Sequence, residues 1–262
     1  MKNALIYIIG LTLLISCTPK RKFQKGFQVN TSDENSELSK IDGLDKDSLK
    51  FETRPGGVLL TGIPNVRLTS IFKVNYKKDK KTTFIGSNNF ITKEEIYEYN
   101  PNNANIWNNH VLPGFDAVYG YNFVNISHYD IKENKQKLFF EKPVLIKTFY
   151  FPSFTKDTLN NKPVNRNYYI VSLYNDDTNK DGFINANDLR RIYLFNINGE
   201  KQKLLVPENY SVFKSEYDSE NDLMYLFAQL DANENGSREE LEPIHVFWVD
   251  LKDPNRTGQQ YK

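Results

Sequence analysis

The chain has 262 residues, with 34 Lys and Arg against 33 Asp and Glu, one Cys and three His. This near-neutral balance argues against a nucleic-acid binding protein, which needs a basic surface. The single Cys excludes a disulfide framework and a thiolate zinc site. A hydrophobic fraction of 39% is enough for a packed core, and the aromatic fraction of 14% favours β-sheet over helix bundles.

The first residues predict export and a lipid anchor. Residues 1–16 contain one Lys and then an apolar run from Ala4 to Ile15, which is too short to span a bilayer comfortably and has the layout of a signal peptide. The run ends in Leu-Ile-Ser-Cys17, which resembles the lipobox of bacterial lipoproteins. The resemblance implies cleavage before Cys17 and its acylation, and more than one acyl chain gives stable membrane anchoring. The alternative is an ordinary signal peptide followed by a coincidental Cys.

The residues after Cys17 indicate to which membrane, and to which face of it, the protein is sorted. Thr18 stands where an inner-membrane retention signal more often has Asp, which favours the outer membrane. Residues 18–22 are basic, whereas the surface-export signals of Bacteroidota lipoproteins tend to be acidic. The resemblance therefore implies a lipid-anchored protein of the outer membrane, on the periplasmic face rather than the cell surface.

The composition divides the mature chain into a tether and one domain. Residues 17–50 carry the lipidated Cys and are otherwise polar, so we expect a flexible tether. Residues 51–262 contain short runs rich in β-branched and aromatic residues, for example 68–74, 168–174 and 245–249, which predict strands. Only residues 92–99 have a helical pattern, with Thr92 and Glu95 in capping-box spacing. The domain is predicted to be mostly β.

Internal similarity predicts repeated sheets. Residues 129–138 match residues 195–204 without a gap, and residues 249–253 echo the start of both. A larger similarity between residues 169–199 and 224–253 gives a period of about 54 residues. We expect an all-β fold of roughly four repeated antiparallel sheets, like the blades of a β-propeller. The alternative is a β-sandwich with calcium loops, because hairpin signals do not specify the topology.

Residues 177–188 have the spacing of an EF-hand calcium loop. Oxygen side chains stand at loop positions 1, 3, 5, 9 and 12, and Gly182 at position 6 allows the sharp turn. Asp at position 12 resembles the dockerin-type loop. The alternative is a solvated turn rich in Asn and Asp. The predicted Ca²⁺ ligands are the side chains of Asp177, Asn179, Asp181, Asn185 and Asp188 and the backbone carbonyl of Phe183.

Residues 231–242 repeat the pattern with Gly236 at position 6. Arg238 replaces the usual aliphatic residue at position 8, and positions 3 and 5 carry no charge, so we expect weaker binding here. Short helical stretches are predicted after the loops, at residues 186–191 and 238–241. Strands precede the loops, as in the calcium loops between propeller strands of integrin α-chains. The predicted ligands are the side chains of Asp231, Asn233, Asn235, Glu239 and Glu242 and the carbonyl of Ser237.

These features predict a calcium-stabilised domain that binds or scaffolds an envelope protein or glycan. We expect calcium to act as a structural clamp, since a sensor needs two helices whose angle changes. No catalytic residue is predicted, because the sequence lacks a phosphate loop, a nucleophile elbow and a His-Glu-x-x-His motif. The alternative is a calcium-dependent envelope hydrolase of glycans or phosphoesters. Carboxylates converging in a deep pocket would favour the enzyme, and a shallow aromatic face would favour binding.

Overall fold

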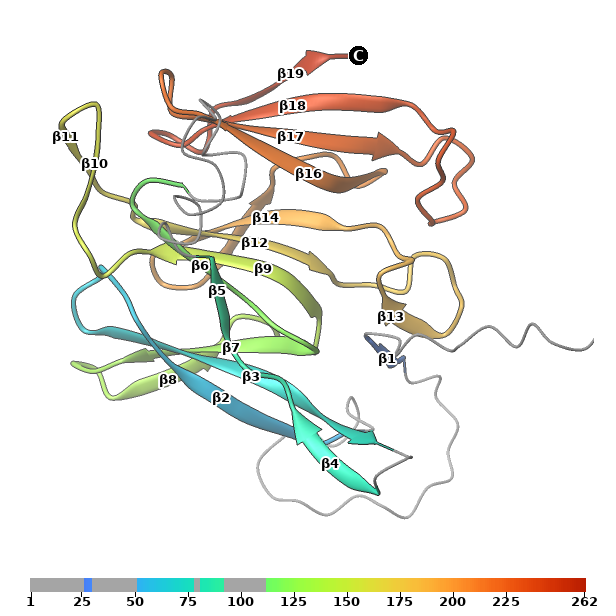
Figure 1. The fold of residues 1–262 in the computed structure, drawn as a ribbon, viewed down its shortest axis with the longest axis horizontal. Coiled ribbons are helices and arrows are strands. Elements are labelled where there is room, and N and C mark those ends of the chain that lie inside the picture. The colour runs from blue at the N-terminus through green and yellow to red at the C-terminus, as the bar shows by residue number, and fades with distance from the viewer. Residues whose placement is uncertain (1–25, 30–50, 78–80, 92–111) are drawn as a thin grey trace, which may run out of the picture.

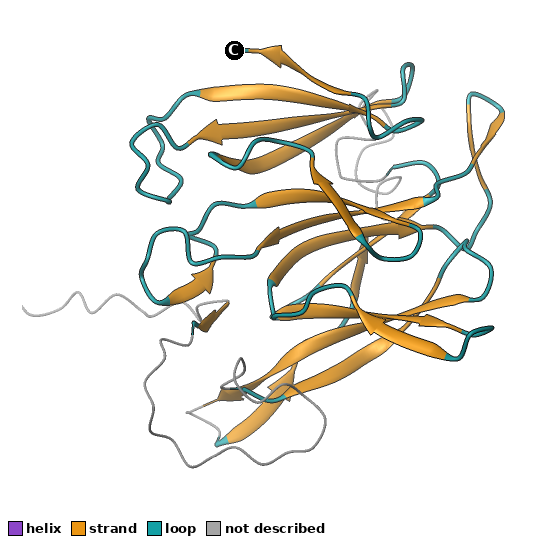
Figure 2. Cartoon of the chain, turned by 180° about the vertical axis from the view of Figure 1, so that it is seen from behind, coloured by secondary structure: helices purple, strands orange, loops and turns teal. Residues whose placement is uncertain are grey.

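The computed structural model describes residues 26–29, 51–77, 81–91 and 112–262. Within these ranges the chain forms strands, turns and loops but no helix (Figure 2), and every strand pair is antiparallel. The prediction of an all-β fold is confirmed. The same part of the chain has no helix that would cross a membrane. The predicted signal peptide, Cys17 and the helix at residues 92–99 lie outside the described residues.

Three sheets, each containing four strands in meander order, stack face to face (Figure 1). The first sheet has β2 (Thr53–Leu60), β3 (Val66–Lys77), β7 (Phe123–Asp130) and β8 (Lys135–Leu138). The second has β9 (Leu145–Pro152), β12 (Tyr168–Tyr174), β14 (Arg191–Asn196) and β15 (Lys201–Leu204). The third has β16 (Tyr210–Asp218), β17 (Leu223–Leu230), β18 (Ile244–Asp250) and β19 (Thr257–Tyr261).

Shorter strands complete the architecture. β4 (Thr82–Ile85) pairs with β3, while β5 (Asn89–Ile91) and β6 (Phe115–Tyr119) extend the second sheet beyond β9. β10 (Asp157–Leu159) and β11 (Lys162–Val164) form a separate hairpin. β1 (Gly26–Gln28) pairs with β13 (Phe183–Asn185). A few residues of the span predicted as a tether therefore lie against the domain.

The segments that are similar in sequence occupy equivalent places. Residues 129–138 form the β7–β8 hairpin and residues 195–204 the β14–β15 hairpin, while residues 249–253 lie where β18 turns into β19. Each hairpin is the last of its meander and ends at a sheet edge. The part of the chain that is described contains three such units, against the four or so expected. Its sheets form an open stack, an arrangement compatible with propeller blades and with a layered sandwich.

The second sheet is buried on both faces, which explains the continuous apolar run of β12. Tyr168 and Ile170 belong to the core shared with the third sheet, and Tyr169 and Val171 belong to the core shared with the first. Successive side chains of a strand point to opposite faces, so a strand between two sheets needs apolar residues at every position. Stacking thus places the ends of β12 and β14 directly beside those of the third sheet.

Candidate metal centre

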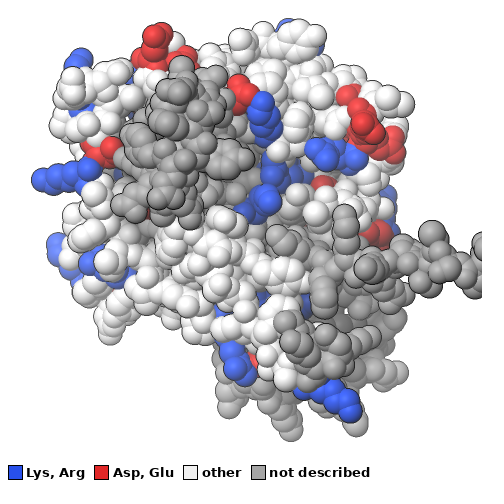
Figure 3. Space-filling model, viewed as in Figure 1, with Lys and Arg blue, Asp and Glu red and all other residues white. Residues whose placement is uncertain are grey.

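The two predicted calcium loops lie at the same end of the second and third sheets. Residues 177–188 connect β12 to β14 and residues 231–242 connect β17 to β18, so both join the second and third strands of a meander. The Thr178 hydroxyl donates a hydrogen bond to the Gly236 carbonyl at 2.6 Å, and Asp188 forms an isolated β-bridge with Ser237. Acidic side chains gather at the upper right of Figure 3, on the side where Figure 1 draws these loops. The paired loops, which we call the loop joint, therefore connect the two sheets.

The first position of each loop organises the backbone in the same way. The Asp177 carboxylate accepts hydrogen bonds from the N–H groups of Asp181 and Gly182 at 3.0 and 2.8 Å. The Asp231 carboxylate accepts bonds from the N–H groups at the same loop positions, 5 and 6, at 3.1 and 3.0 Å. Two loops that are far apart in the sequence thus share one internal hydrogen-bond pattern.

The loops also share their unusual backbone angles. Position 4 has a positive φ in both, 58° at Lys180 and 57° at Glu234, and position 6 has φ values of 84° at Gly182 and 73° at Gly236. Glycine adopts this left-handed conformation without the steric cost that a Cβ imposes. Position 236 also requires glycine for steric reasons, because a Cβ there would lie 1.9 Å from the Thr178 carbonyl oxygen.

Side chains at positions 3, 5 and 9 converge in the first loop. The Asp181 Oδ2 atom lies 3.5 Å from Asn179 Nδ2 and 3.2 Å from Asn185 Nδ2. Each amide carries an oxygen beside its nitrogen, so a half-turn of the amide presents an oxygen at the same place. Three of the five predicted ligand side chains therefore meet at one point.

The second loop shows the same convergence with a different distribution of charge. Asn233 Nδ2 lies 3.2 Å from Glu239 Oε2, and Asn235 Nδ2 lies 2.6 Å from Glu239 Oε1. The carboxylate of this trio stands at position 9, whereas that of the first loop stands at position 5. Each trio contributes one carboxylate and two amides.

Position 12 closes each loop and stays apart from the trio. Asp188 is 1% exposed, and its carboxylate accepts hydrogen bonds from the N–H groups of Thr178 and Asn185, both at 2.8 Å. The Glu242 carboxylate accepts bonds from the N–H groups at the same positions, 2 and 9, at 2.9 and 3.1 Å. Burial raises the pKa of Asp188 above its usual value, although the N–H donors oppose the shift; the charge of Asp177 adds to it.

The prediction of short helical stretches after the loops is wrong. Residues 186–191 and 238–241 contain turns and irregular backbone, and β14 begins at Arg191. In the first loop the Asp188 carboxylate takes the N–H of Asn185, and residue 188 then enters the bridge to the other loop. These side-chain and inter-loop bonds compete with the backbone bonds that a helical turn needs.

The donor set suits a hard cation. Among the described residues no group of three His, Cys, Asp or Glu side chains is placed to hold a metal ion. The converging trios consist of one carboxylate and two amides each, and the predicted sets add backbone carbonyl oxygens. Calcium accepts such mixed oxygen ligands, whereas zinc prefers nitrogen and sulfur. A carboxylate has about four acceptor sites, so Asp177 and Asp231 keep capacity beyond their two backbone bonds.

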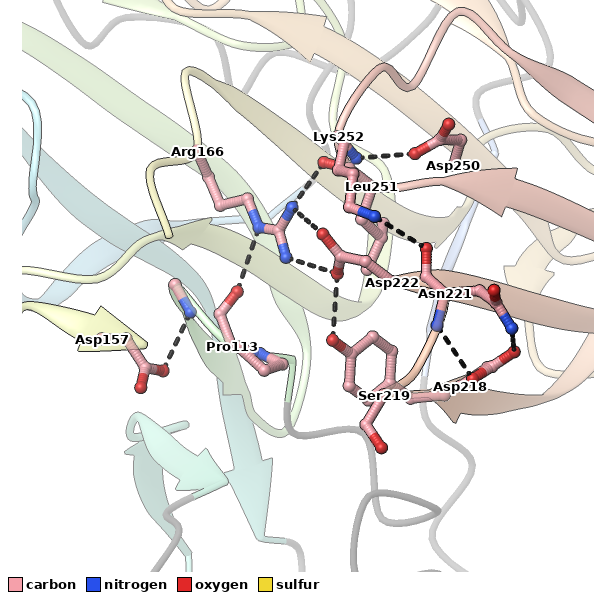
Figure 4. Close-up of polar contacts among 12 residues, drawn as sticks. Pro113, Asp157, Arg166, Asp218, Ser219, Asn221, Asp222, Asp250, Leu251 and Lys252 are labelled. Carbon is pink, nitrogen blue, oxygen red and sulfur yellow. Dashed lines mark hydrogen bonds and ion pairs between the residues drawn. The ribbon is translucent and has the colours of Figure 1, made fainter. Parts of the chain in front are cut away.

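A second polar cluster joins the same two sheets at their opposite end (Figure 4). Arg166, 4% exposed and located between β11 and β12, forms a bidentate pair with Asp222 in the β16–β17 turn, with N···O distances of 2.7 and 3.0 Å. The guanidinium also donates to the carbonyls of Leu251 at 2.5 Å and Pro113 at 3.0 Å. We call this cluster the arginine joint.

Two tyrosines complete the arginine joint. The Tyr217 hydroxyl donates to Asp222 at 2.9 Å, and the Tyr168 hydroxyl donates to the Leu251 carbonyl at 2.7 Å. Burial opposes the charge of Arg166, but the hydrogen bonds and charge of Asp222 hold its pKa above the usual value. Sequence reasoning missed this cluster, since Arg166 and Asp222 belong to no motif. The positive φ of 61° at Asp222 becomes visible only in the folded turn.

The two described histidines each have a hydrogen-bond partner. His128 Nε2 lies 3.2 Å from the Ile197 carbonyl, and His245 Nδ1 lies 2.7 Å from the Tyr210 hydroxyl, on different sheets. His110, the third histidine, lies outside the described residues. A cavity of about 340 Å³ between the second and third sheets has no charged residue in its lining. It is lined by Leu204, Leu205, Val206, Pro207, Phe247, Thr257, Gly258 and Gln259.

The outer face of the third sheet is aromatic. Met224, Leu226 and Ala228 of β17 pack into the core, so the alternating residues lie on the opposite face. On that face Tyr225 pairs with Trp248 of β18, and these side chains are only partly buried. Tyr261 of β19 is 63% exposed. We call this surface the aromatic face; it consists of Tyr225, Phe227, Val246, Trp248 and Tyr261.

Comparisons with known proteins identify no family. No protein-family model matches this chain, and no curated protein matches it. Among solved structures, the crystal structure of Porphyromonas gingivalis dipeptidyl peptidase 4 is similar at 11% sequence identity with a TM-score of 0.21. The alignment covers 84% of this chain and 39% of that one, so the chain spans less than half of that structure.

Proposed function

We propose that this protein is a lipid-anchored cell-envelope protein whose β domain is stabilised by calcium and serves in binding or scaffolding. One observation carries the calcium assignment: two separate loops place oxygen-bearing side chains, positive φ angles and hydrogen bonds at the same positions of an EF-hand spacing. A solvated turn has no reason to repeat this pattern at matching positions.

In this proposal calcium clamps the second sheet to the third. In the first loop, Asp177, Asp181 and Asp188 bring like charges into one short segment, and an oxygen-bound cation would neutralise them. The two loops already touch through Thr178 and Gly236, so a metal in either loop stiffens the contact between sheets. The loops connect strands and no helix pair flanks them, which favours a clamp over a sensor.

Heating the full chain in detergent, with calcium or with chelator, tests this proposal. Calcium at 100 times its dissociation constant adds about 2.7 kcal/mol per site to the free energy of unfolding, so the melting temperature is expected to rise. The two loops differ at position 5, which provides matched variants. Asp181→Asn is expected to weaken the first site, and Asn235→Asp to strengthen the second, because carboxylates bind calcium more tightly than amides. A melting curve indifferent to both calcium and chelator contradicts the proposal.

The proposed anchor is lipid on Cys17, which places the protein at the outer membrane, on its periplasmic face. The support is the lipobox-like ending of the apolar run and the basic residues that follow. Replacement Cys17→Ser is expected to leave a soluble or unprocessed form, measured by membrane fractionation. Equal recovery of the variant and the wild type in outer membranes contradicts lipid anchoring.

The proposed role is binding of an envelope protein or glycan. The aromatic face supports binding, because partly exposed Tyr and Trp side chains supply much contact area at low cost in side-chain entropy. Hydrolysis would need carboxylates that converge in a pocket, and the apolar cavity beside β19 has none.

A further inference from the structure

The first calcium loop holds a strand from the N-terminal part of the chain. β1 and β13 lie side by side in Figure 1 and pair antiparallel, with Gly26 opposite Asn185 and Gln28 opposite Phe183. The N–H of Val29 continues the contact by donating to the Gly182 carbonyl at 2.9 Å. Residues 26–29 therefore lie along positions 6 to 9 of the loop.

Contacts outside the loop also position β1. The N–H of Gly26 donates to Asn122 Oδ1 at 2.8 Å, and the Lys73 ammonium donates to the Gly26 carbonyl at 3.2 Å. The side chain of Phe27 is buried in a small apolar cluster. Its buried members are Phe27, Val124, Leu145 and Ile184.

The pairing of β1 with β13 depends on the shape of the loop. Each strand has three residues, and so small a two-stranded sheet is not stable by itself in water. β13 is therefore held in place by the rest of residues 177–188 and by Ile184, which packs in the apolar cluster. Phe183 and Asn185, at the two ends of β13, are also predicted calcium ligands, through a backbone carbonyl and a side chain. The same short strand would therefore serve the metal, through Phe183 and Asn185, and also the N-terminal strand.

We infer that calcium in the first loop controls the docking of residues 26–29 on the domain. This inference rests on the proposed calcium site. Without metal, the like charges of Asp177, Asp181 and Asp188 weaken the loop and with it the edge that β1 uses. With metal, the loop is fixed and β1 keeps its partner.

Docking changes the length of chain between Cys17 and the domain. With β1 in place, eight residues lie between Cys17 and Gly26, and a fully extended chain of this length reaches about 30 Å. With β1 released, the next strand among the described residues is β2, which begins at Thr53; the 35 residues between Cys17 and Thr53 reach at most about 120 Å. For a protein anchored at Cys17, calcium would therefore decide how far the domain can stand from the membrane.

Hydrogen exchange of the full chain in detergent tests the inference during a calcium titration. The amides of Phe27 and Val29, which face β13, are expected to exchange up to about 100-fold more slowly at 100 times the dissociation constant, if β1 opens only in the metal-free form. The midpoint of this protection is expected to match the midpoint of the rise in melting temperature. Asp181→Asn is expected to move the protection midpoint to higher calcium.

Phe27→Ala is the matched control, because it removes the buried side chain that anchors β1 and replaces no predicted ligand. The Phe27 side chain is 6% exposed and packs with Val124, Leu145 and Ile184, none of which is a predicted ligand. The variant is expected to lose the protection of residues 27 and 29 and to keep a calcium-dependent rise in melting temperature. If calcium raises the wild-type melting temperature but leaves exchange at residues 27 and 29 unchanged, the inference fails and the proposed site stands. If calcium changes neither, both fail.

Discussion

The second and third sheets are joined at both ends, and the two joints differ in how their charges are balanced. The arginine joint contains its own cation, because Arg166 forms a bidentate pair with Asp222 at 2.7 and 3.0 Å. The loop joint gathers carboxylates and amides, and among the described residues none of its carboxylates forms an ion pair. In the arginine joint the negative charge is balanced by a cation of the chain itself. In the loop joint the carboxylates lie beside amides, and no cation of the described residues is paired with them in this way.

This difference indicates where the stability of the protein should depend on solution conditions. A buried pair whose partners are both covalently part of the chain loses its stabilisation only on unfolding or mutation. A cluster of oxygen ligands gains stability by mass action when a cation binds it. The arginine joint should therefore be indifferent to calcium, and the loop joint should respond to it.

Breaking the arginine joint is expected to have the largest effect. Arg166→Met leaves Asp222 as a buried unpaired charge, which costs about 3–5 kcal/mol. The loss in free energy of unfolding, measured with urea, is expected to be equal in calcium and in chelator. Adding Asp222→Asn to Arg166→Met is expected to recover part of it, because the buried charge is then removed.

The control for this prediction is an ion pair at the surface. Arg54 lies 2.8 Å from Glu52, and the two side chains are 56% and 55% exposed, so Arg54→Met is expected to cost at most about 1 kcal/mol. A cost for Arg166→Met no greater than that of the control would show that burial does not decide the strength of the joint.

The glycines at position 6 provide the next largest contrast. Gly236→Ala places a Cβ 1.9 Å from the Thr178 carbonyl oxygen at a φ of 73°, and the combined overpacking and backbone strain is expected to cost about 3 kcal/mol. Gly182→Ala has a similar φ of 84°, but its Cβ meets nothing within 4 Å, so only about 1–2 kcal/mol of strain is expected. Urea unfolding of both variants measures the difference. Equal costs would mean that the loops are not in contact in solution.

The smallest effect concerns the pH dependence set by Asp188. Burial raises its folded-state pKa above the unfolded value of about 3.9. The carboxyl therefore contributes stability below that unfolded value, and this contribution is lost as the pH rises through the folded-state pKa. In chelator, the free energy of unfolding of the wild type is expected to fall relative to Asp188→Asn as the pH rises from 4 to 7. A constant difference between the two proteins over this range contradicts a raised pKa.

Local sequence patterns predicted much of the architecture. The runs of β-branched and aromatic residues identified strands such as Tyr168–Tyr174, and the similarity of residues 129–138 to residues 195–204 identified equivalent edge hairpins. These predictions succeeded because strand periodicity and hairpin turns are encoded within about ten residues. The short helices expected after the loops failed because bonds from the Asp188 carboxylate and from the neighbouring loop outweigh local helix propensity.

The sequence by itself determined the β class, the positions of the repeats and the oxygen-rich spacing of the two loops, because each depends on residues close together in the chain. Only the tertiary structure decided that the loops touch, that Arg166 meets Asp222 across 56 residues and that Gly26–Gln28 pair with β13. These contacts join segments that are far apart in the chain, and no pattern in the sequence of one segment predicts its contact with the other. They follow from the face-to-face stacking of the sheets, which buries apolar residues and thereby brings distant polar groups together.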